Sequence, residues 1–508
     1  MHRITPGHAR PLFGTAATQR IERLCATPLP AHTLMQRAGL AVAHLARALA
    51  PHARTVWIAC GPGNNGGDGL EAAIHLHRHG LQVVVTCLGT PERAPEDARQ
   101  AWQRARAAGV PFSDGAPAQL GQNDLCIDAL LGLGLAPGDR RAAPDPQSPL
   151  LSVLRQLRRS AAPLLAVDLP SGLQADTGQY APGFAADTPP DAVAPAARHT
   201  LSLLTLKPGL FTGAGRDAAG TVWFDDLACD PGGEPASAWL AGPPPAAARP
   251  HASHKGSYGD VAVVGGEGLQ ARGMGMSGAA LLAGRAALHS GAGRVLLAPL
   301  DAGRLELDPQ QPELMLRHFG VLPLEHLTVV CGCGGGEAVR AVLAPVLARA
   351  PRLVLDADAL NAVAADTALQ EALGARAQRG QSTVLTPHPL EAARLLGQET
   401  AEVQAHRLAA AQRLAERFAC AVVLKGSGTV VAAPGRAPHI NPTGNARLAT
   451  AGTGDVLAGM VGAGLAGGAS APQAAVAAVF AHGLAADQWP AEQALTASRL
   501  AVHGMGFE

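Results

Sequence analysis

The stretch NPTGNARLATAGTGDVLAGM, residues 441–460, passes from a loop rich in glycine and proline into an apolar helix that begins near Asp455. Glycines in the last turn before a helix let backbone N–H groups converge on an anion, because no Cβ atom stands in the way. The helix dipole adds positive potential at the same point. We therefore expect the junction AGTGD, residues 451–455, to bind a phosphate.

Asp455 stands where its charge would repel a phosphate, so it needs a role of its own. One role is chemical: the carboxylate takes the proton from a hydroxyl group as that oxygen attacks phosphorus. The other role is structural, as the N-cap of the following helix in a glycine-rich loop. The local sequence leaves both interpretations open.

The longer pattern is more specific. TGN at residues 443–445, followed by ATAGTGDVLAG at residues 449–459, resembles the signature of ADP-dependent NAD(P)H-hydrate dehydratases, which belong to the ribokinase-like superfamily. The resemblance implies a three-layer α/β/α sandwich for this part of the chain and a catalytic role for Asp455.

Composition limits the class of protein. The chain has 508 residues, which predicts two or three domains. Its 40 basic and 40 acidic residues cancel and form no basic block, so no nucleic-acid partner is expected. Neither a secretory h-region nor an apolar span of about 20 residues is present, so we expect a cytoplasmic protein with no membrane partner. The eight cysteines show no CxxC spacing and are expected to be small core residues of a reducing compartment.

The first half contains a βαβ unit. A strand at residues 55–60 precedes a glycine-rich turn, GPGNNGGDG at residues 61–69, then a helix at about residues 70–79 and a strand at residues 81–88. The turn matches neither GxGxxG nor GxxxxGK[ST]. Its backbone amides and the side-chain oxygens of Asn64, Asn65 and Asp68 could hold a phosphate and a hard cation. A tight turn with Asn and Asp in left-handed conformations is the alternative.

Two further strands end in carboxylates. Residues 125–128 end at Asp128, and residues 164–168 end at Asp168. The carboxyl ends of parallel strands meet in one crevice, so we expect both groups at the same site, although each alone could be a helix N-cap. Lys207 follows another apolar strand, and is either a second polar group of the site or a solvated side chain.

The glycine-rich turn, the Asp128 segment and VDLPSGL at residues 167–173 together resemble the NAD(P)H-hydrate epimerase domain, over roughly residues 10–225. The resemblance implies that Asp168 lines the substrate pocket and that K⁺ is held by Asn65, Asp128 and Ser171. It also implies substrate contacts from two loops: Asn64, Asn65, Gly66, Gly67 and Asp68 in the first, and Gly132, Leu133, Gly134, Leu135, Ala136, Pro137 and Gly138 in the second. The family usually reads GTGL where this chain has GLGL at residues 132–135.

A proline-rich stretch at residues 230–250 is expected to be a linker between an epimerase domain, residues 1–229, and a dehydratase domain, residues 251–508. After it, strands alternate with helices, which predicts a doubly wound α/β layer sandwich. HKGSYG, DADALN, TPHP, KGSGT and GTGD follow in this order and extend the dehydratase resemblance over about residues 251–505.

That resemblance assigns two groups of ligand contacts. The adenine nucleotide is expected at Lys425, Gly426, Ser427, Gly428, Thr429 and Gly454, and the hydrated nicotinamide nucleotide at Ala279, Gly334, His388 and Asp455. The chain departs from the family at two loops: GCGGG replaces GPGLG at residues 332–336, and HPLE replaces HPGE at residues 388–391.

The expected fold is α/β throughout, with a Rossmann-like three-layer sandwich followed by a ribokinase-like one. The expected function is repair of hydrated NADH and NADPH: epimerisation of the R and S forms with Asp168 as acid/base, then dehydration of the S form with ADP and Mg²⁺ and with Asp455 as base, giving AMP and phosphate. Alternatives are a ribokinase-like kinase of a small alcohol fused to a nucleotide-binding regulatory domain, and a non-catalytic interaction module in the first domain. A homo-oligomer is expected.

Overall fold

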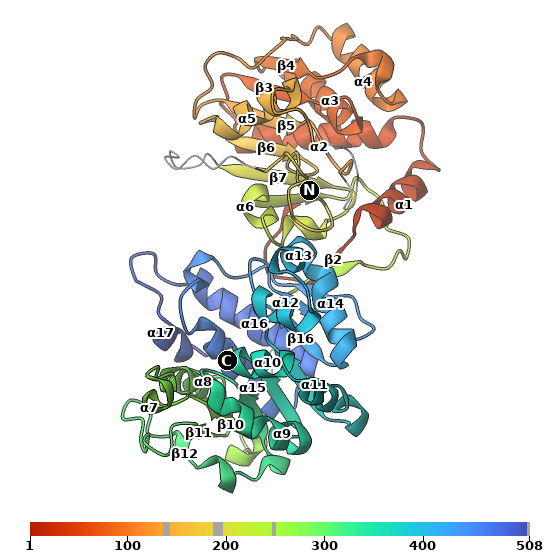
Figure 1. Ribbon diagram of the computed structural model, residues 1–508. Helices are drawn as coiled ribbons and strands as arrows, with labels where there is room; N and C mark the ends of the chain where they lie inside the picture. The colour runs from red at the N-terminus through yellow and green to blue at the C-terminus, as the bar shows by residue number, and fades with distance from the viewer. Residues whose placement is uncertain (136–142, 186–196, 246–249, 505–508) are drawn as a thin grey trace. The chain divides into compact units, whose positions relative to one another are not determined.

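The computed structural model describes residues 1–135, 143–185, 197–245 and 250–504, and it divides into two compact units (Figure 1). The first unit comprises Met1–Thr5 and Pro11–Ala238, and the second comprises Pro6–Arg10 and Trp239–Glu508. Three residues of the expected second substrate loop, Ala136, Pro137 and Gly138, lie outside the described residues.

The first unit is built on a sheet with the strand order β1-β8-β7-β6-β5-β3-β4. The pairs from β8 to β4 are parallel, and β1 alone of these strands runs antiparallel to its neighbour. The strand bounds are β1 His2–Arg3, β3 Val56–Cys60, β4 Val83–Cys87, β5 Leu125–Ala129, β6 Leu164–Val167, β7 Arg198–Leu203 and β8 Thr221–Asp225.

Helices cover both faces of this sheet. Val56 and Ile58 of β3 pack into an apolar cluster with α2, α3 and α4, whereas Trp57 and Ala59 pack on the opposite face with α5. Every residue of β3 is therefore buried, as expected for a parallel strand between two helical layers. The helix bounds are α1 Thr15–Ala26, α2 Thr33–Leu49, α3 Asn64–Arg78, α4 Glu96–Ala107, α5 Pro149–Arg159 and α6 Gly215–Ala219.

The helix after β3 differs from the expected one in where it begins. The sequence predicts a start at about residue 70, but α3 starts at Asn64, so only residues 61–63 form the turn. Gly66 and Gly67 are thus helical, and a Cβ atom at either would collide with Gly61 or Met35. The glycines of this motif serve close packing of the first helical turn.

The second unit is built on a longer sheet with the order β12-β11-β10-β13-β14-β15-β16-β17-β18-β9-β2. Pairing is parallel from β12 to β16, and β17 is antiparallel to both of its neighbours. The strand bounds are β2 Arg10–Leu12, β9 Ala238–Leu240, β10 Asp260–Gly265, β11 Arg294–Pro299, β12 Met315–Leu316, β13 Thr328–Cys331, β14 Arg352–Leu355, β15 Ser382–Leu385, β16 Ala421–Leu424, β17 Val430–Ala432 and β18 His439–Ile440. Strand β9 lies within residues 230–250 and pairs with β18 through Trp239 and His439.

Alternate residues of the central strands enter two different cores. Val261 and Val263 of β10 pack with α8, α15, α16 and α17, and Ala262 and Val264 pack with the helices from α9 to α14. Both units are therefore α/β sandwiches of three layers, and this prediction is confirmed. The helix bounds are α7 Leu269–Arg272, α8 Ser277–His289, α9 Arg340–Arg349, α10 Ala357–Ala364, α11 Thr367–Gly374, α12 Pro389–Leu396, α13 Thr400–Ala405, α14 Arg407–Phe418, α15 Thr453–Ala466, α16 Ala471–Asp487 and α17 Ala497–Ala501. In the part of the chain that the structure describes, we find no helix with the length and apolar character needed to cross a membrane.

Candidate active sites

The first unit has a cavity of about 580 Å³ at the carboxyl ends of β3, β5, β6 and β7. This is the edge at which parallel α/β sheets bind ligands. Most of the expected residues reach it, together with Glu22 and Lys207, which the resemblance did not assign. The predicted lining residues found there are Asn64, Asn65, Asp68, Gly132, Leu133, Gly134, Leu135 and Asp168.

Asp128 and Ser171 lie behind the wall of this cavity and are both buried. The Ser171 hydroxyl donates to Asp128 Oδ1 at 2.6 Å, and the Ser171 amide donates to Oδ2 at 3.0 Å. Burial raises the pKa of the Asp128 carboxyl, and the hydrogen bonds from Ser171 oppose that rise. A Cβ atom on Gly132 would lie 3.3 Å from Asn65 Oδ1.

The side-chain amide of Asn65 provides the observation that favours a bound cation. Its Nδ2 atom is buried without a hydrogen-bond partner. Because the oxygen and nitrogen of a side-chain amide are assigned from their partners, the reversed orientation would place an unsatisfied oxygen there. An oxygen from Asn65, a carboxylate from Asp128 and a hydroxyl from Ser171 are the ligand types that hard cations take, so these residues fit K⁺.

Asp168 directly follows β6 and has a left-handed backbone conformation, with φ of 67°. Its Oδ1 accepts hydrogen bonds from the Leu203 amide at 3.1 Å and from the Lys207 ammonium group. Lys207 is fully buried, and it also donates to the Leu203 carbonyl at 2.7 Å. The alternative of a solvated Lys207 is therefore wrong, because the lysine neutralises the buried carboxylate of Asp168.

Two further carboxyls share the cavity with this ion pair. The pKa of Asp68 lies well above its ordinary value, first because of burial and second because of the Asp168 charge. The pKa of Glu22 is raised for the same two reasons, in the same order. Carboxyls with raised pKa values beside an ion pair are suited to giving and taking protons.

In the second unit Asp455 is the third residue of α15, and the N-cap is Gly452, at φ of 87°. The structure therefore excludes the N-cap interpretation of Asp455. The loop before α15 is held from two sides: Thr453 Oγ1 donates to the Leu448 carbonyl at 2.8 Å, and His482 Nε2 donates to the Thr453 carbonyl at 2.9 Å.

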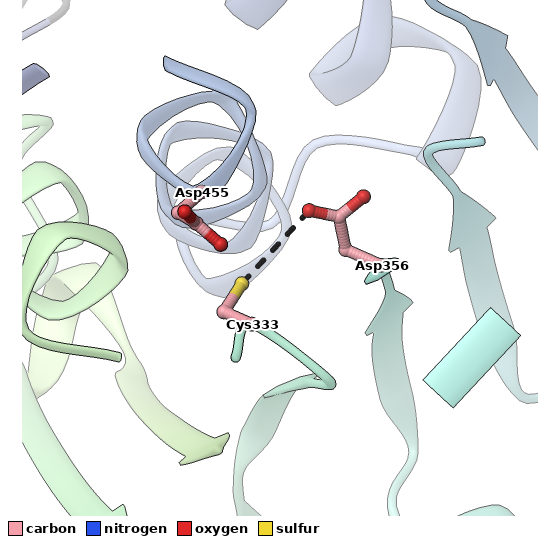
Figure 2. A group of neighbouring side chains, drawn as sticks. All are labelled: Cys333, Asp356 and Asp455. Atoms are coloured by element: carbon pink, nitrogen blue, oxygen red, sulfur yellow. Dashed lines mark hydrogen bonds between the residues drawn. The ribbon is translucent and has the colours of Figure 1, made fainter. Parts of the chain in front are cut away.

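Asp455 faces two other polar side chains, Asp356 and Cys333 (Figure 2). They come from α15, from the residue after β14 and from the turn after β13, and their ligand atoms all lie within 4.8 Å of one another. Cys333 Sγ is 4.0 Å from Asp356 Oδ2. Both Cys333 and Asp356 are buried, whereas Asp455 is partly exposed.

Asp356 is fixed by two donors on neighbouring strand ends. Its Oδ1 accepts from Lys425 Nζ at 2.7 Å and from Thr386 Oγ1 at 2.8 Å. The Lys425 amide donates to the Pro387 carbonyl at 2.9 Å. The motifs DADALN, TPHP and KGSGT thus meet at one edge of the sheet, beside the amino end of α15.

The two carboxylates, Asp356 and Asp455, differ in their electrostatic surroundings. Burial lowers the pKa of Lys425, but the charges of Asp356 and Glu391 outweigh that effect and raise it, so this ammonium stays charged. The pKa of Asp455 is raised to about 6, first by burial and then by the charge of Asp356. A carboxyl with this pKa is ionised at neutral pH and still binds a proton readily, as a general base must.

The remaining residues expected in this unit surround the same edge. Gly334 has φ of 57°, and a Cβ atom on it would lie 2.8 Å from Ala279 Cβ, so these two residues are in contact. A Cβ atom on Gly454 would lie 3.3 Å from Lys425 Nζ. His388 caps α12 and pairs with Glu391. The expected nucleotide loop, Gly426, Ser427, Gly428 and Thr429, joins β16 to β17.

Two functional neighbours were missed from the sequence. His482 is buried in α16, and burial lowers its pKa to about 4, so a neutral ring supports the loop before α15. Arg407 is also buried and donates to the carbonyls of Leu424 and Lys425, each at 3.2 Å, which positions the start of the KGSGT loop. Neither residue lies in a motif, so only the fold could identify them.

The residues of this site fit Mg²⁺ in part. The carboxylates of Asp356 and Asp455 are the hard oxygen ligands that Mg²⁺ prefers, whereas the Cys333 thiol is not. A cation here would be held by the two carboxylates together with phosphate oxygens.

Models of known protein families match both halves of the chain. A family model described as NAD(P)H-hydrate dehydratase matches residues 263–503, and one described as YjeF-related protein N-terminus matches residues 31–209. The chain is 36% identical to the bifunctional NAD(P)H-hydrate repair enzyme Nnr of Escherichia coli, covering 94% of this chain and 87% of that protein. It is 32% identical to the enzyme of the same name from Coxiella burnetii, covering 94% of each.

Among solved structures, the chain is similar to the ADP/ATP-dependent NAD(P)H-hydrate dehydratase of Bacillus subtilis, co-crystallised with ATP and Mg²⁺. The identity is 31%, the match covers 50% of this chain and 90% of that one, and the TM-score is 0.42. The curated relatives confirm the sequence resemblance of both halves over 94% of the chain, and the chain belongs to the family of bifunctional NAD(P)H-hydrate repair enzymes.

Proposed function

We propose that this protein repairs hydrated NADH and NADPH in two steps, one in each unit. The first unit interconverts the R and S epimers, and the second dehydrates the S epimer with ADP, giving NAD(P)H, AMP and phosphate. The observation that carries the proposal is the position of Asp455: a carboxyl with a pKa of about 6 at the amino end of a helix, beside Asp356 and Lys425.

In the dehydratase step the substrate hydroxyl is first activated. Asp455 takes the proton from the C6 hydroxyl of the hydrated nicotinamide, and that oxygen attacks the β-phosphorus of ADP. The amides of residues 452–454 lie at the amino end of α15, where they stabilise negative charge that develops on the phosphate. Bound Mg²⁺ would supply further neutralisation of the phosphate oxygens. Phosphate leaves more readily than hydroxide, so elimination restores the reduced ring.

Binding of the two nucleotides in this unit rests on the residues placed above. Ala279, Gly334 and His388 would contact the hydrated substrate, and residues 425–429 with Gly454 would hold ADP. Lys425 is fixed to Asp356 and adjoins Gly454, so its ammonium group is directed to the junction where phosphate is expected. Small residues at 279, 334 and 454 leave room for close approach of a ligand to the backbone.

In the epimerase step Asp168 would act as acid/base on the substrate, while Asn64, Asn65 and Asp68 would contact its phosphates. Support comes from the cavity, where Asp168, Asp68 and Glu22 lie together with one buried ammonium group from Lys207. K⁺ held by Asn65, Asp128 and Ser171 would supply positive charge near these phosphates. Such a set of buried polar groups disfavours a purely structural role for this unit.

Membership of the repair family disfavours the small-alcohol kinase, and one experiment separates the two reactions directly. A kinase leaves the phosphoryl group on its product, whereas the dehydratase releases one phosphate per NADH formed. We expect equimolar AMP, phosphate and NADH from the S epimer and ADP. A stable phosphorylated product without phosphate release would overturn the proposal. The same reaction with ATP in place of ADP gives the comparison.

We also propose that the protein is cytoplasmic and forms a homo-oligomer.

A further inference from the structure

Two of the eight cysteines end neighbouring strands of the first unit. Cys60 is the last residue of β3 and Cys87 the last of β4, and the two are paired in parallel register. Both side chains belong to the same apolar face of the sheet. Neighbouring strands lie about 4.7–4.9 Å apart. That spacing falls within the separation of about 4.4–6.8 Å found between Cα atoms of disulfide-bonded cysteines.

The two thiols differ in accessibility. Cys60 is fully buried, whereas Cys87 is half-buried and lines a small hollow beside Gly61 and Pro62. Neither cysteine has a role in the proposed reactions. An accessible thiol next to a buried one is the arrangement in which the first reacts with an oxidant and the second resolves the product.

The electrostatics favour the same order of reaction. A hydrogen bond with Cys60 lowers the pKa of Cys87, burial opposes this, and the charge of Arg106 adds to the lowering. The pKa of Cys60 is raised well above its ordinary value, first by the interaction with Cys87 and then by burial. Because the thiolate is the nucleophile in disulfide exchange, Cys87 is the thiol that attacks.

We propose that Cys60 and Cys87 form a reversible disulfide, with a low-molecular-weight disulfide such as oxidised glutathione as oxidant. Cys87 attacks one sulfur of the oxidant, which forms a mixed disulfide and releases one thiol. Cys60 then loses its proton and attacks Sγ of Cys87, which expels the second thiol. In total two cysteine thiols are oxidised by two electrons, and the oxidant is reduced to two thiols that carry the two protons.

The bond would act on the segment that carries the substrate contacts. Cys60 directly precedes Gly61, whose Cβ position is only 1.8 Å from the Leu130 carbonyl oxygen, and a Cβ atom on Gly66 would lie 1.9 Å from the Gly61 carbonyl oxygen. With so little free space, any shift of Cys60 on forming the bond would displace the start of α3. Asn64 and Asn65 would move with it, so we expect oxidation to lower epimerase activity. This consequence rests on the proposed function.

The same unit contains a matched control pair, Cys25 and Cys229. These thiols also interact, and Cys25 is buried while Cys229 is half-buried. Here, however, the pKa of the more accessible thiol, Cys229, is raised to about 12, first by burial and then by Cys25. Cys229 therefore stays protonated, and this pair should resist exchange under conditions that oxidise Cys60 and Cys87.

The test begins with the unchanged full-length chain. The protein is equilibrated in glutathione buffers of increasing oxidised fraction, free thiols are trapped by alkylation, and disulfide-linked peptides are mapped by mass spectrometry. We expect a Cys60–Cys87 linkage that dithiothreitol reverses, with Cys25 and Cys229 still alkylated. A mixed disulfide that persists on Cys87 without linkage to Cys60, or earlier linkage of Cys25 to Cys229, would overturn the proposal.

Activity measurements then separate the disulfide from the proposed reaction. We expect oxidation to lower epimerase kcat/KM by about 10- to 100-fold, because misplacement of a binding segment by about 1 Å has that effect. Cys87→Ala should remove this sensitivity, and Cys229→Ala should keep it. Equal sensitivity of the two variants would overturn the link to activity. If the reduced chain has no epimerase activity, the proposed function fails, while the peptide map still decides whether the disulfide forms.

Discussion

Carboxylate oxygens of Asp455 and Asp356 lie within 4.8 Å of each other, and Asp356 Oδ1 accepts a hydrogen bond from Lys425 Nζ at 2.7 Å. The charge of Asp356 helps to raise the pKa of Asp455. The pair thus divides its roles: Asp356 organises the strand ends, and Asp455 exchanges a proton near neutral pH.

The first prediction concerns Asp455→Asn. The amide cannot accept the hydroxyl proton, so we expect dehydratase kcat to fall by about 10²- to 10⁴-fold. Epimerase activity of the same variant is the internal control and should be unchanged, because Asp455 lies in the other unit. NADH formation from the pure S epimer measures the first activity, and loss of one epimer by chromatography measures the second. A variant with full dehydratase turnover would exclude Asp455 as the base.

The second prediction is the pH dependence of the dehydratase. The base must be ionised, so kcat/KM should fall as pH decreases through about 6, the pKa of Asp455. The Cys333 thiol lies close to Asp455, and its interaction with the carboxyl lowers the pKa of Asp455. Cys333→Ala should therefore move the acid limb to higher pH, by up to about one unit for a hydrogen bond of this kind. Cys331→Ala is the matched control, and an equal shift in both variants would contradict the assignment.

The third prediction concerns stability, and its sign follows from the raised pKa. The native state binds the Asp455 proton more tightly than the unfolded chain does, so stability decreases as pH rises from about 4 to about 6. Above that range the ionised carboxylate destabilises the fold by about 1–2 kcal/mol, after allowance for partial solvent exposure. Asp455→Asn should thus raise Tm at pH 8 and leave it almost unchanged at pH 4. An increase confined to pH 4 would refute this explanation.

The fourth prediction tests the buried ion pair of the first unit. Lys207→Met leaves the Asp168 carboxylate buried without its partner, and should lower the free energy of unfolding of this unit by about 3–5 kcal/mol. The double variant Asp168→Asn, Lys207→Met should recover much of that stability and remain inactive as an epimerase. Chemical denaturation measures both. If the single variant is as stable as the parent chain, Lys207 is not neutralising a buried charge.

The fifth prediction separates the K⁺ ligands. Asn65 Nδ2 has no partner, so Asn65→Ala should leave Tm nearly unchanged and raise the K⁺ concentration needed for half-maximal epimerase activity about tenfold, which corresponds to about 1.4 kcal/mol. Ser171→Ala should both lower Tm and raise this K⁺ concentration, because the Ser171 hydroxyl also donates a hydrogen bond to Asp128 at 2.6 Å. Dehydratase activity in the same titration is the control. Epimerase activity that is equal in K⁺ and in tetramethylammonium would rule out the site.

The sequence allowed prediction of the strands and of the polar groups that follow them. Asp168 follows a short apolar run, which in a parallel sheet places its side chain at the carboxyl edge, and the structure has it there. These predictions succeeded because a buried strand and the residue after it form a local pattern. The early start of α3 was missed, because glycine has a low helix propensity and only packing against Gly61 and Met35 explains it.

Partners far apart in the chain could not be predicted. The burial of Lys207 depends on Asp168, which is 39 residues away. His482 reaches the Thr453 carbonyl from a different helix. The pairing of Cys60 with Cys87 depends on strand register, which the hydrophobic pattern alone does not specify when both faces of a strand are buried.

The central claim is that the two units act in succession, and recovery of absorbance at the reduced-nicotinamide band tests it most directly. A mixture of both epimers of hydrated NADH is incubated with the protein, ADP, Mg²⁺ and K⁺. A second reaction that contains only dehydratase activity measures the spontaneous epimerisation, and this contribution is subtracted. We predict complete recovery of NADH with the parent chain, and recovery limited to the S fraction with Asp168→Asn. Recovery that stops at the S fraction with the parent chain, or no recovery at all, would contradict the proposal.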